Sequence, residues 1–458
     1  MFHIGKRTLT TTQIIAVGFL AAIIIGTILL CLPISSKART WTPLIDSVFM
    51  ATTSICVTGL VTVTTVEHWS LFGQAVILLL IQFGGLGVVT FTTTMLLILR
   101  KRITLTERLL IQDAYNLNTL RGLVRLTKRI VKATLMLEGI GALFLAIQFI
   151  PDYTFFPGVW KAVFISVSAM CNAGIDLIGS YSLVPYQGNI LVNFTVITLI
   201  VLGGIGFPVW WDVVAQIKER RQKKTMCSPK KFFSKLTLHS KVVIAVSLIL
   251  ILGGMLLVFL LEYSNPNTLG SMPLWKKLMA SLFQSVTTRT AGFLTVPQES
   301  MRNTTSFICM ILMFIGGSPS GTAGGVKTVT VAMIILSAYC IIKGREDTEI
   351  FHRKVPSGIV RKSLAVVIIS SGVLITATTL LSITENAQFI DVFYETTSAL
   401  ATVGLSRGLT GNLTFLGKII IIVTMYVGRI GPISLALFFN TSKKAKNRSL
   451  PEGKIMVG

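Results

Sequence analysis

Four short segments of the sequence end in a glycine that is followed by a bulky apolar residue. They read FMATTSICVTGL (Phe49–Leu60), FISVSAMCNAGI (Phe164–Ile175), FQSVTTRTAGF (Phe283–Phe293) and YETTSALATVGL (Tyr394–Leu405). An aromatic residue stands ten residues before the glycine in three copies and nine before it in the third. The glycines, Gly59, Gly174, Gly292 and Gly404, are separated by 115, 118 and 112 residues. This nearly constant period predicts four copies of one structural unit.

The chemistry that these segments could perform is that of their backbone. Glycine adopts conformations closed to other residues, so each segment can turn carbonyl oxygens toward a common axis, where they replace the water shell of a cation. Thr402-Val403-Gly404 repeats the first three residues of the TVGYG loop of potassium channels. The alternative is that the glycines only cap four helices. We predict a selectivity filter made of Val57, Thr58, Gly59, Asn172, Ala173, Gly174, Thr290, Ala291, Gly292, Thr402, Val403 and Gly404.

A second glycine-rich stretch, GGSPSGTAGG (Gly316–Gly325), interrupts an apolar region. That region runs for 40 residues from Asn303 to Ile342, whereas about 20 residues cross a bilayer as a helix. We therefore predict a helix broken within the membrane by a mobile gating loop, with a passive connection lining a cavity as the alternative. The residues predicted to gate are Gly316, Gly317, Ser318, Ser320, Gly321, Thr322, Gly324, Gly325, Lys327 and Arg429.

Charged residues inside apolar segments are functional candidates because a charge is costly at membrane depth. Arg429 could repel cations or pair with the gating loop, and its alternative is to extend to the membrane surface. That alternative applies more strongly to Lys327. Glu138 interrupts another apolar segment, and no partner for it can be named from the sequence.

The composition places the elements that carry these residues in a membrane. The 458 residues are 52% hydrophobic and 13% charged, and their mean hydropathy is +0.75. Several uncharged runs are long enough to span a bilayer. The first is too long for a signal peptide core and predicts a retained helix. These runs are Thr8–Ser36, His68–Leu99, Leu177–Trp211, Val242–Leu261 and Ser363–Thr384.

The net charge of +24 is explained by topology. Residues 100–132 carry nine Lys and Arg, 217–241 nine, 343–362 six and 440–458 five, whereas the alternate loops carry few. The positive-inside rule then places the basic loops and both termini in the cytoplasm. Nucleic-acid binding is not needed to explain the charge. The lipid bilayer is the expected surrounding, and anionic headgroups or an acidic cytosolic protein could contact the basic loops.

No constellation typical of an enzyme or a resident metal is present. The six cysteines lack CxxC spacing, and five of them lie in apolar or pore-like segments, so we expect reduced thiols. The four histidines do not cluster, and no paired acids occur at membrane depth. We predict a protein that is not an enzyme and has no tightly bound cofactor. A purely structural scaffold is the remaining class, and it would tolerate loss of the four glycines.

Each unit is predicted to contain a spanning helix, a short re-entrant helix, the glycine turn and a second spanning helix. The fold class is an all-α polytopic membrane protein with eight spanning helices and four pore helices around a pseudo-fourfold axis. Two crossings per unit make the units parallel, which distinguishes them from the inverted repeats of many transporters. The units are residues 1–113, 114–228, 229–350 and 351–458.

The predicted helices of the four units follow from the apolar runs. The first spanning helices are Thr8–Pro33, Ile130–Ile150, Val242–Tyr263 and Ser363–Thr384. The pore helices are Leu44–Val57, Val159–Cys171, Leu274–Thr288 and Phe389–Ala401. The second spanning helices are Leu71–Leu99, Asn189–Ile217, Thr304–Ile342, which is the broken one, and Leu416–Phe439.

Taken together, these motifs resemble the Trk/Ktr/HKT superfamily of potassium transporters, and most closely the membrane subunits of its Ktr branch. The resemblance covers the whole chain. It includes the four glycine segments, TRTAGF (Thr288–Phe293), GGVKT (Gly324–Thr328), GRIGP (Gly428–Pro432) and LPEGKIMVG (Leu450–Gly458). One departure is Cys171, where many relatives would have a second asparagine before Asn172.

The resemblance implies K⁺ uptake through the bacterial plasma membrane, stimulated by Na⁺. It also implies a homodimer with one pore per subunit, resting on a cytosolic ring of regulatory subunits that bind ATP or ADP. The basic loops would be docking surfaces for that ring, and this subunit itself would bind no nucleotide. A sodium-selective or poorly selective cation transporter of the same fold remains the alternative.

Overall fold

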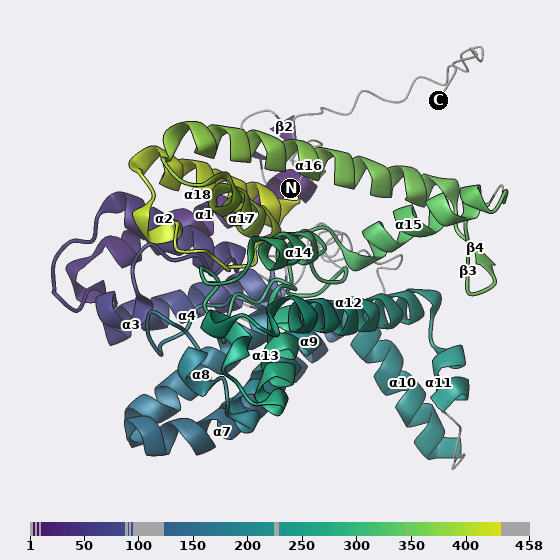
Figure 1. Ribbon diagram of the computed structural model, residues 1–458, viewed down its shortest axis with the longest axis horizontal. Helices are drawn as coiled ribbons and strands as arrows, with labels where there is room; N and C mark the ends of the chain where they lie inside the picture. The colour runs from purple at the N-terminus through teal and green to yellow at the C-terminus, as the bar shows by residue number, and fades with distance from the viewer. Residues whose placement is uncertain are drawn as a thin grey trace.

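The computed structural model describes residues 11–87, 123–223, 229–345 and 347–431, with short pieces at 3–4, 7–8, 90 and 93–94. Most of this is helical (Figure 1). In chain order the helices are α1 (Thr11–Cys31), α2 (Leu44–Cys56), α3 (Thr65–His68), α4 (Leu71–Leu86), α7 (Leu123–Tyr153), α8 (Phe155–Cys171), α9 (Ile190–Ile205), α10 (Phe207–Lys223), α11 (Pro229–Lys235), α12 (Leu238–Glu262), α13 (Leu274–Thr287), α14 (Asn303–Phe314), α15 (Thr328–Ile342), α16 (Ser357–Thr384), α17 (Phe389–Ala401) and α18 (Phe415–Ile430). Two small antiparallel hairpins join β1 (His3–Ile4) to β2 (Arg7–Thr8) and β3 (Glu349–Ile350) to β4 (Arg353–Lys354).

Four helices, α1, α7, α12 and α16, are each long and apolar enough to cross a membrane. They correspond to the first spanning helix predicted for each unit. Helix α16 begins six residues earlier than predicted, because Arg361 and Lys362 lie inside it instead of ending it. The long stems of such side chains can follow the helix while their charged ends reach the membrane surface. The protein is therefore a helical polytopic membrane protein.

The four predicted pore helices are present as α2, α8, α13 and α17. Each ends within one residue of its predicted end. The aromatic residues that begin the four glycine segments, Phe49, Phe164, Phe283 and Tyr394, lie within these helices and are all completely buried. Burial of an aromatic side chain contributes strongly to packing, so these residues fix each short helix in the interior.

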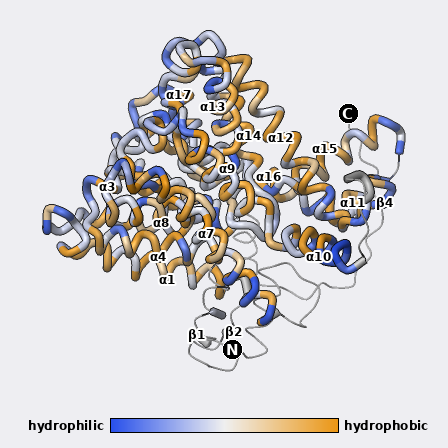
Figure 2. Tube along the Cα trace, turned by 90° about the horizontal axis from the view of Figure 1, so that it is seen from below, coloured by the Kyte–Doolittle hydropathy of each residue, from blue (hydrophilic) through white to orange (hydrophobic). Residues whose placement is uncertain are grey.

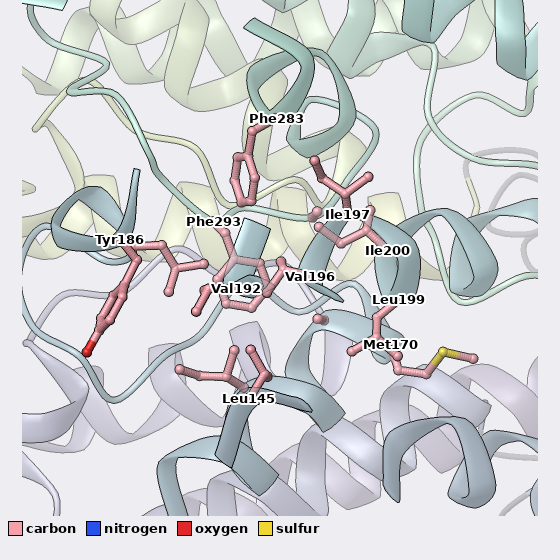
Figure 3. Packing of buried hydrophobic residues seen from close by; sticks show 14 of the residues in the cluster. Leu145, Met170, Tyr186, Val192, Val196, Ile197, Leu199, Ile200, Phe283 and Phe293 are labelled. Atoms are coloured by element: carbon pink, nitrogen blue, oxygen red, sulfur yellow. The ribbon is translucent and has the colours of Figure 1, made fainter. Parts of the chain in front are cut away.

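The core around α8, α9 and α13 shows how the pore helices are held (Figure 3). Phe283 from α13 and Phe293 from the following loop face Val192 and Val196 of α9. Leu145 of α7 closes this cluster from the other side. Residues of the second and third predicted units thus share one apolar core, which fixes their glycine segments relative to each other.

The second spanning helices differ from the prediction. Only Thr304–Ile342 was predicted to be broken, and it is: α14 ends at Phe314 and α15 begins at Thr328. The continuous helix predicted for Asn189–Ile217 is wrong, because α9 and α10 meet at Gly206 with a bend of 100°. Gly206 has φ +93°, a conformation that glycine adopts readily, and Pro208 lacks the N–H that a continuing helix would use.

The same kind of break ends two further helices early. Helix α4 stops at Leu86 before Gly87, and α18 stops at Ile430 before Gly431. Both glycines have positive φ, +81° and +92°. The predicted continuation to Leu99 lies mostly outside the described residues, and the one to Phe439 lies wholly outside them after Gly431. Cys227, Pro432 and the motif Leu450–Gly458 also lie outside the described residues.

Basic segments gather at one end of the molecule. Helices α10 and α11 and the β3–β4 hairpin lie together at the right of Figures 1 and 2, although α11 and β3 are far apart in sequence. Figure 2 shows hydrophilic residues on α10 and near β4, in contrast to the largely hydrophobic long helices. Two of the four predicted basic clusters, 217–241 and 343–362, are therefore on the same side.

We predict that Gly206→Ala lowers the melting temperature of the purified protein by a few degrees. A Cβ at Gly206 would lie 2.5 Å from the carbonyl oxygen of Pro319, and the positive φ would cost a further 1–2 kcal/mol or so. The measurement is thermal unfolding in detergent.

The matched control is Gly139→Ala in α7, where an added Cβ has no atom within 4 Å. It should leave the melting temperature unchanged or slightly raise it, since alanine favours helix over glycine. Equal melting temperatures for the two variants would contradict a conformational requirement at Gly206.

Candidate ion-conduction site

The four predicted filter glycines meet in the interior. A Cβ built on Gly404 would lie 2.9 Å from the Cα of Gly59 and 3.2 Å from that of Gly292, and one on Gly174 would lie 2.7 Å from the Cα of Gly292. Backbones approach this closely only where no side chain intervenes. The structure therefore brings together four segments that are separated by more than a hundred residues in sequence.

The contacts among these segments form a closed cycle. A side chain at each glycine would strike the carbonyl oxygen that precedes the glycine of the next segment. The distance from the added Cβ to that oxygen is 2.5 Å for Gly59 and Ala173, 2.5 Å for Gly174 and Ala291, and 2.6 Å for Gly292 and Val403. An added Cβ at Gly404 would strike the carbonyl oxygen of Thr58, which closes the cycle. Four carbonyl groups thus surround the point where the glycines meet.

The residue two positions before each glycine has a left-handed backbone conformation. Val57, Asn172, Thr290 and Thr402 have φ of +56°, +59°, +66° and +52°. Three of them follow directly on their helices, where paired backbone hydrogen bonds such as Thr58 to Thr53 and Val57 to Ser54 close the helix end. Such a conformation costs on the order of 1–3 kcal/mol for a non-glycine residue and is found mainly at functional sites.

The residues that follow the glycines anchor the loops. Leu60, Ile175, Phe293 and Leu405 are at most 1% exposed. Because these side chains point into apolar cores, the backbone between them and the helix ends is left to face the meeting point. This arrangement accounts for the bulky apolar residue that follows every copy of the glycine.

An open cavity of about 310 Å³ lies on one side of the glycines and is lined by all four of them. Asp176 and Glu299 are among its other lining residues, together with several backbone and hydroxyl groups. Among the residues that the structure describes, no Lys or Arg lines it. A cation approaching from this side therefore meets negative charge and oxygen atoms first.

The glycine-rich loop Gly316–Gly325 lies directly against the opposite side of the predicted filter residues. The hydroxyl of Thr322 is 3.1 Å from Oδ1 of Asn172, and the Gly324 amide donates to Oγ1 of Thr290 at 3.2 Å. Gly324 also packs against Thr402, where it has no room for a side chain. The loop thus contacts three of the four left-handed residues.

The same loop is bonded to the bend between α9 and α10. Amides of Ser318 and Thr322 donate to the carbonyls of Gly204 and Gly203 at 2.9 and 3.1 Å. In return, the Phe207 amide donates to the Ser320 carbonyl at 3.1 Å. The unpredicted bend and the predicted break are therefore two parts of one structure.

Both predicted basic residues contact the loop. Arg429 donates to the carbonyl of Thr322 at 2.8 Å and to that of Gly84 in α4 at 2.5 Å. Lys327 donates to the carbonyls of Ala323 and Gly324 at 2.8 and 3.3 Å. Arg429 is therefore in direct contact with the loop. Both residues line a second cavity of about 440 Å³ beneath the loop.

A repeated motif in the second helices was missed from the sequence. GGLG (Gly84–Gly87), GGIG (Gly203–Gly206), GGSP (Gly316–Pro319) and GRIG (Gly428–Gly431) begin 25, 29, 24 and 24 residues after the filter glycines. In three of them the first glycine leaves no space for a side chain against a carbonyl at the end of a pore helix. This spacing could have revealed every break, and it shows that Arg429 occupies a glycine position.

Polar partners that come from distant parts of the chain were also missed. Glu138 accepts a hydrogen bond from Gln82 at 3.3 Å and lies 3.9 Å from the thiol of Cys171. Arg407 forms an ion pair with Asp391 at 2.7 Å, close to the glycine loop of the last segment. Sequence spacing carries no signal for these pairs, because each joins residues from separate elements.

Comparison with known proteins extends these observations. The sequence model of the TrkH family, described as a cation transport protein, matches residues 3–449. The chain is 41% identical to the Ktr system potassium uptake protein B of Bacillus subtilis (strain 168), over 98% of this chain and 97% of that protein. It is 35% identical to the potassium/sodium uptake protein NtpJ of Enterococcus hirae, over 99% and 98% of the two chains.

A solved structure shares the fold. The crystal structure of the potassium transporter TrkH from Vibrio parahaemolyticus superposes with a TM-score of 0.72, covering 95% of this chain and 86% of that one at 16% identity. At this identity the likeness shows the fold alone. The family model and the two relatives carry the assignment, and they confirm the resemblance noted in the glycine segments. This chain therefore belongs to the TrkH family of cation transport proteins.

Proposed function

We propose that this chain is the ion-translocating subunit of a potassium uptake system and that K⁺ passes between the four glycine segments. The observation that carries the proposal is the closed cycle in which Gly59, Gly174, Gly292 and Gly404 each abut the carbonyl before the next glycine. Carbonyl oxygens at that position could replace the water shell of K⁺. The names of relatives such as the Ktr system potassium uptake protein B support K⁺ as the cargo.

The pore helices favour a cation electrostatically. Helices α2, α8, α13 and α17 all end at the filter segments, so their partial negative charges gather around one point. A potassium ion that has lost its water shell would be stabilised there. The protein is then a transporter without catalytic residues or a resident cofactor, and Na⁺ is a possible second ion.

We propose that Gly316–Gly325 is a gate and that the structure has it closed. The loop lies between the filter residues and the cavity beneath it, and Arg429 and Lys327 hold its carbonyls. A cation leaving the filter would meet these two positive charges. Movement of the loop would remove both the obstruction and the nearby charge.

The proposed architecture has four parallel units, with eight crossings and four pore helices around a pseudo-fourfold axis. The common position of α10, α11 and the β3–β4 hairpin supports a cytoplasmic side rich in basic residues, with both termini there. The word "system" in the relatives' names supports a partner. We propose a homodimer on a cytosolic ring that binds ATP or ADP, in a bacterial plasma membrane, with uptake stimulated by Na⁺.

A second candidate is a sodium-selective or poorly selective cation transporter. One relative is named a potassium/sodium uptake protein. In addition, the four quarters of the filter differ, since Val57, Asn172, Thr290 and Thr402 occupy equivalent left-handed positions. A filter built from four chemically different segments need not have the ion selectivity of a potassium channel built from four identical ones.

We predict that Gly404→Ala lowers K⁺ flux about tenfold or more in reconstituted vesicles. The positive φ and the nearby Thr58 carbonyl leave no place for the methyl group, and a misfit of about 1.4 kcal/mol already corresponds to a factor of ten. The control is Gly411→Ala, which lines the same outer cavity but has no atom within 4 Å of the added Cβ. Flux that is equal in the two variants would sink the proposed filter.

We predict that Arg429→Ala raises K⁺ flux about tenfold and makes it less dependent on the regulatory ring. The substitution removes the hydrogen bond from the Arg429 guanidinium to the Thr322 carbonyl of the loop, and such a charged bond stabilises the closed loop by roughly 1.5–3 kcal/mol. It also removes the bond to the Gly84 carbonyl, which anchors the guanidinium to α4. Shortening the loop between Gly316 and Gly325 should act in the same direction. Flux is measured with and without the cytosolic partner.

Arg429→Lys separates charge from geometry, because lysine keeps the charge but cannot bond both carbonyls as a rigid fork. Increased flux in the lysine variant would assign closure to the two hydrogen bonds. Unchanged flux in both variants would leave Arg429 as a structural anchor only.

Competition between ions decides between the two candidate functions. We predict that excess external Na⁺ does not lower ⁸⁶Rb⁺ uptake by the reconstituted protein, because the carbonyl cycle favours the larger, more easily dehydrated ion. Na⁺ uptake that equals or exceeds Rb⁺ uptake would favour the sodium or non-selective alternative instead.

A further inference from the structure

An apolar groove of about 400 Å³ opens between α14, α15, α16 and α17. It occupies the space where the broken span leaves α14 and α15 apart. Its floor and sides include Phe314, Ile315, Val331 and Ser371. One of its few polar groups, the hydroxyl of Thr397, is already bonded to the Phe393 carbonyl at 2.7 Å. The groove therefore offers an apolar ligand a nearly continuous hydrocarbon surface.

The position of the groove identifies its occupant. Phe307, Ile311 and Ile335 line it and are 52%, 44% and 62% exposed, and they lie on the short apolar helices α14 and α15, next to the long apolar helix α16. The medium outside such a surface is lipid hydrocarbon, not water. An empty groove would forfeit dispersion contacts, and water would find almost no hydrogen-bond partners in it. A lipid acyl chain satisfies both conditions.

The groove shares a wall with the cavity beneath the gating loop. Phe314 lines both spaces. Successive residues of α16 divide between them, with Ser370 lining the cavity and Ser371 the groove. A molecule in the groove would thus lie one side-chain layer away from the proposed ion path.

The groove also touches residues on both flanks of the gating loop. Ile315 immediately precedes the loop, and Val331 lies in the first turn of α15, six residues after Gly325. The two ends are joined at the groove by the bond from the Val326 amide to the Phe314 carbonyl at 3.1 Å. A chain packed across Ile315 and Val331 would favour the loop arrangement that keeps these ends together.

We propose that this groove binds one phospholipid acyl chain as a regulatory ligand that stabilises the closed gate. The regulatory part rests on the proposed gating role of Gly316–Gly325, whereas binding of the chain does not. The binding and the regulation can therefore fail separately, and each has its own measurement.

Binding is tested with a phospholipid that carries a photoactivatable diazirine in its acyl chain. The full-length protein is reconstituted in phosphatidylethanolamine and phosphatidylglycerol vesicles, irradiated, and mapped by peptide mass spectrometry. We expect adducts on the groove residues of α14, α15 and α16, and their loss when Val331→Phe or Ile335→Trp fills the groove. Adducts that persist at wild-type level in both filled variants, or a cross-link between two copies at α15, would overturn the proposal.

A second apolar groove in the same chain supplies the control. It has about 440 Å³, is lined by Leu20, Thr52 and Val423 of α1, α2 and α18, and includes no residue of the gating loop. Val423→Trp fills it at a position that is 55% exposed, comparable to Ile335. This variant should leave labelling of the first groove intact.

Regulation is tested by K⁺ flux in vesicles of short-chain and long-chain phospholipids. A side chain that fills the groove acts as a permanent occupant, so Val331→Phe and Ile335→Trp should lower flux about two- to tenfold and abolish its dependence on chain length. Val423→Trp should keep the wild-type flux and dependence. Loss of labelling with flux and its chain-length dependence unchanged would overturn the regulatory claim. If no form of the protein carries flux, the proposed function fails, and the labelling result still decides whether the chain binds.

Discussion

Four backbone segments approach one another so closely at Gly59, Gly174, Gly292 and Gly404 that none of these positions could carry a side chain. The rest of the structure maintains that approach. Apolar residues after the glycines and aromatic residues within the four short helices that precede them are completely or almost completely buried. Left-handed residues before the glycines cost on the order of 1–3 kcal/mol each, so the surrounding cores must compensate. Apolar packing in this protein therefore serves to expose backbone in its interior.

The pore helices and the meeting of the glycines could be predicted because both depend on local features, namely the length of an apolar run and a glycine at a fixed distance from an aromatic residue. The bend at Gly206 could not be predicted from hydropathy. The uncharged run Leu177–Trp211 continues across the bend, and hydropathy does not report backbone direction. The bond between Phe207 and Ser320 and the contact between Gln82 and Glu138 join distant segments, so no local pattern contains them.

Internal repetition allows one copy of a motif to change while the others keep the fold. Gly85, Gly204 and Gly317 occupy the second position of the first three motifs. Arg429 occupies the second position of the fourth motif. The backbone break after the motif is preserved at Gly431, but the guanidinium now reaches across to the carbonyls of Thr322 and Gly84. A structural glycine has thus been replaced by a residue that joins three of the four segments, and the cost is a positive charge near the proposed cation path.

The bonds between the loop and the α9–α10 bend set an energy scale for opening. Three backbone hydrogen bonds and one from Arg429 to the Thr322 carbonyl hold the loop, which together amount to on the order of 3–7 kcal/mol. Shifting a two-state equilibrium from 1:99 to 99:1 takes about 5.5 kcal/mol of differential binding. An ion that binds the proposed filter equally well in both states supplies none of this energy. Helix α10 continues directly from the bend at Gly206, and the bend is hydrogen-bonded to the loop. A protein that binds α10 and rotates it about Gly206 could therefore supply the energy that moves the loop.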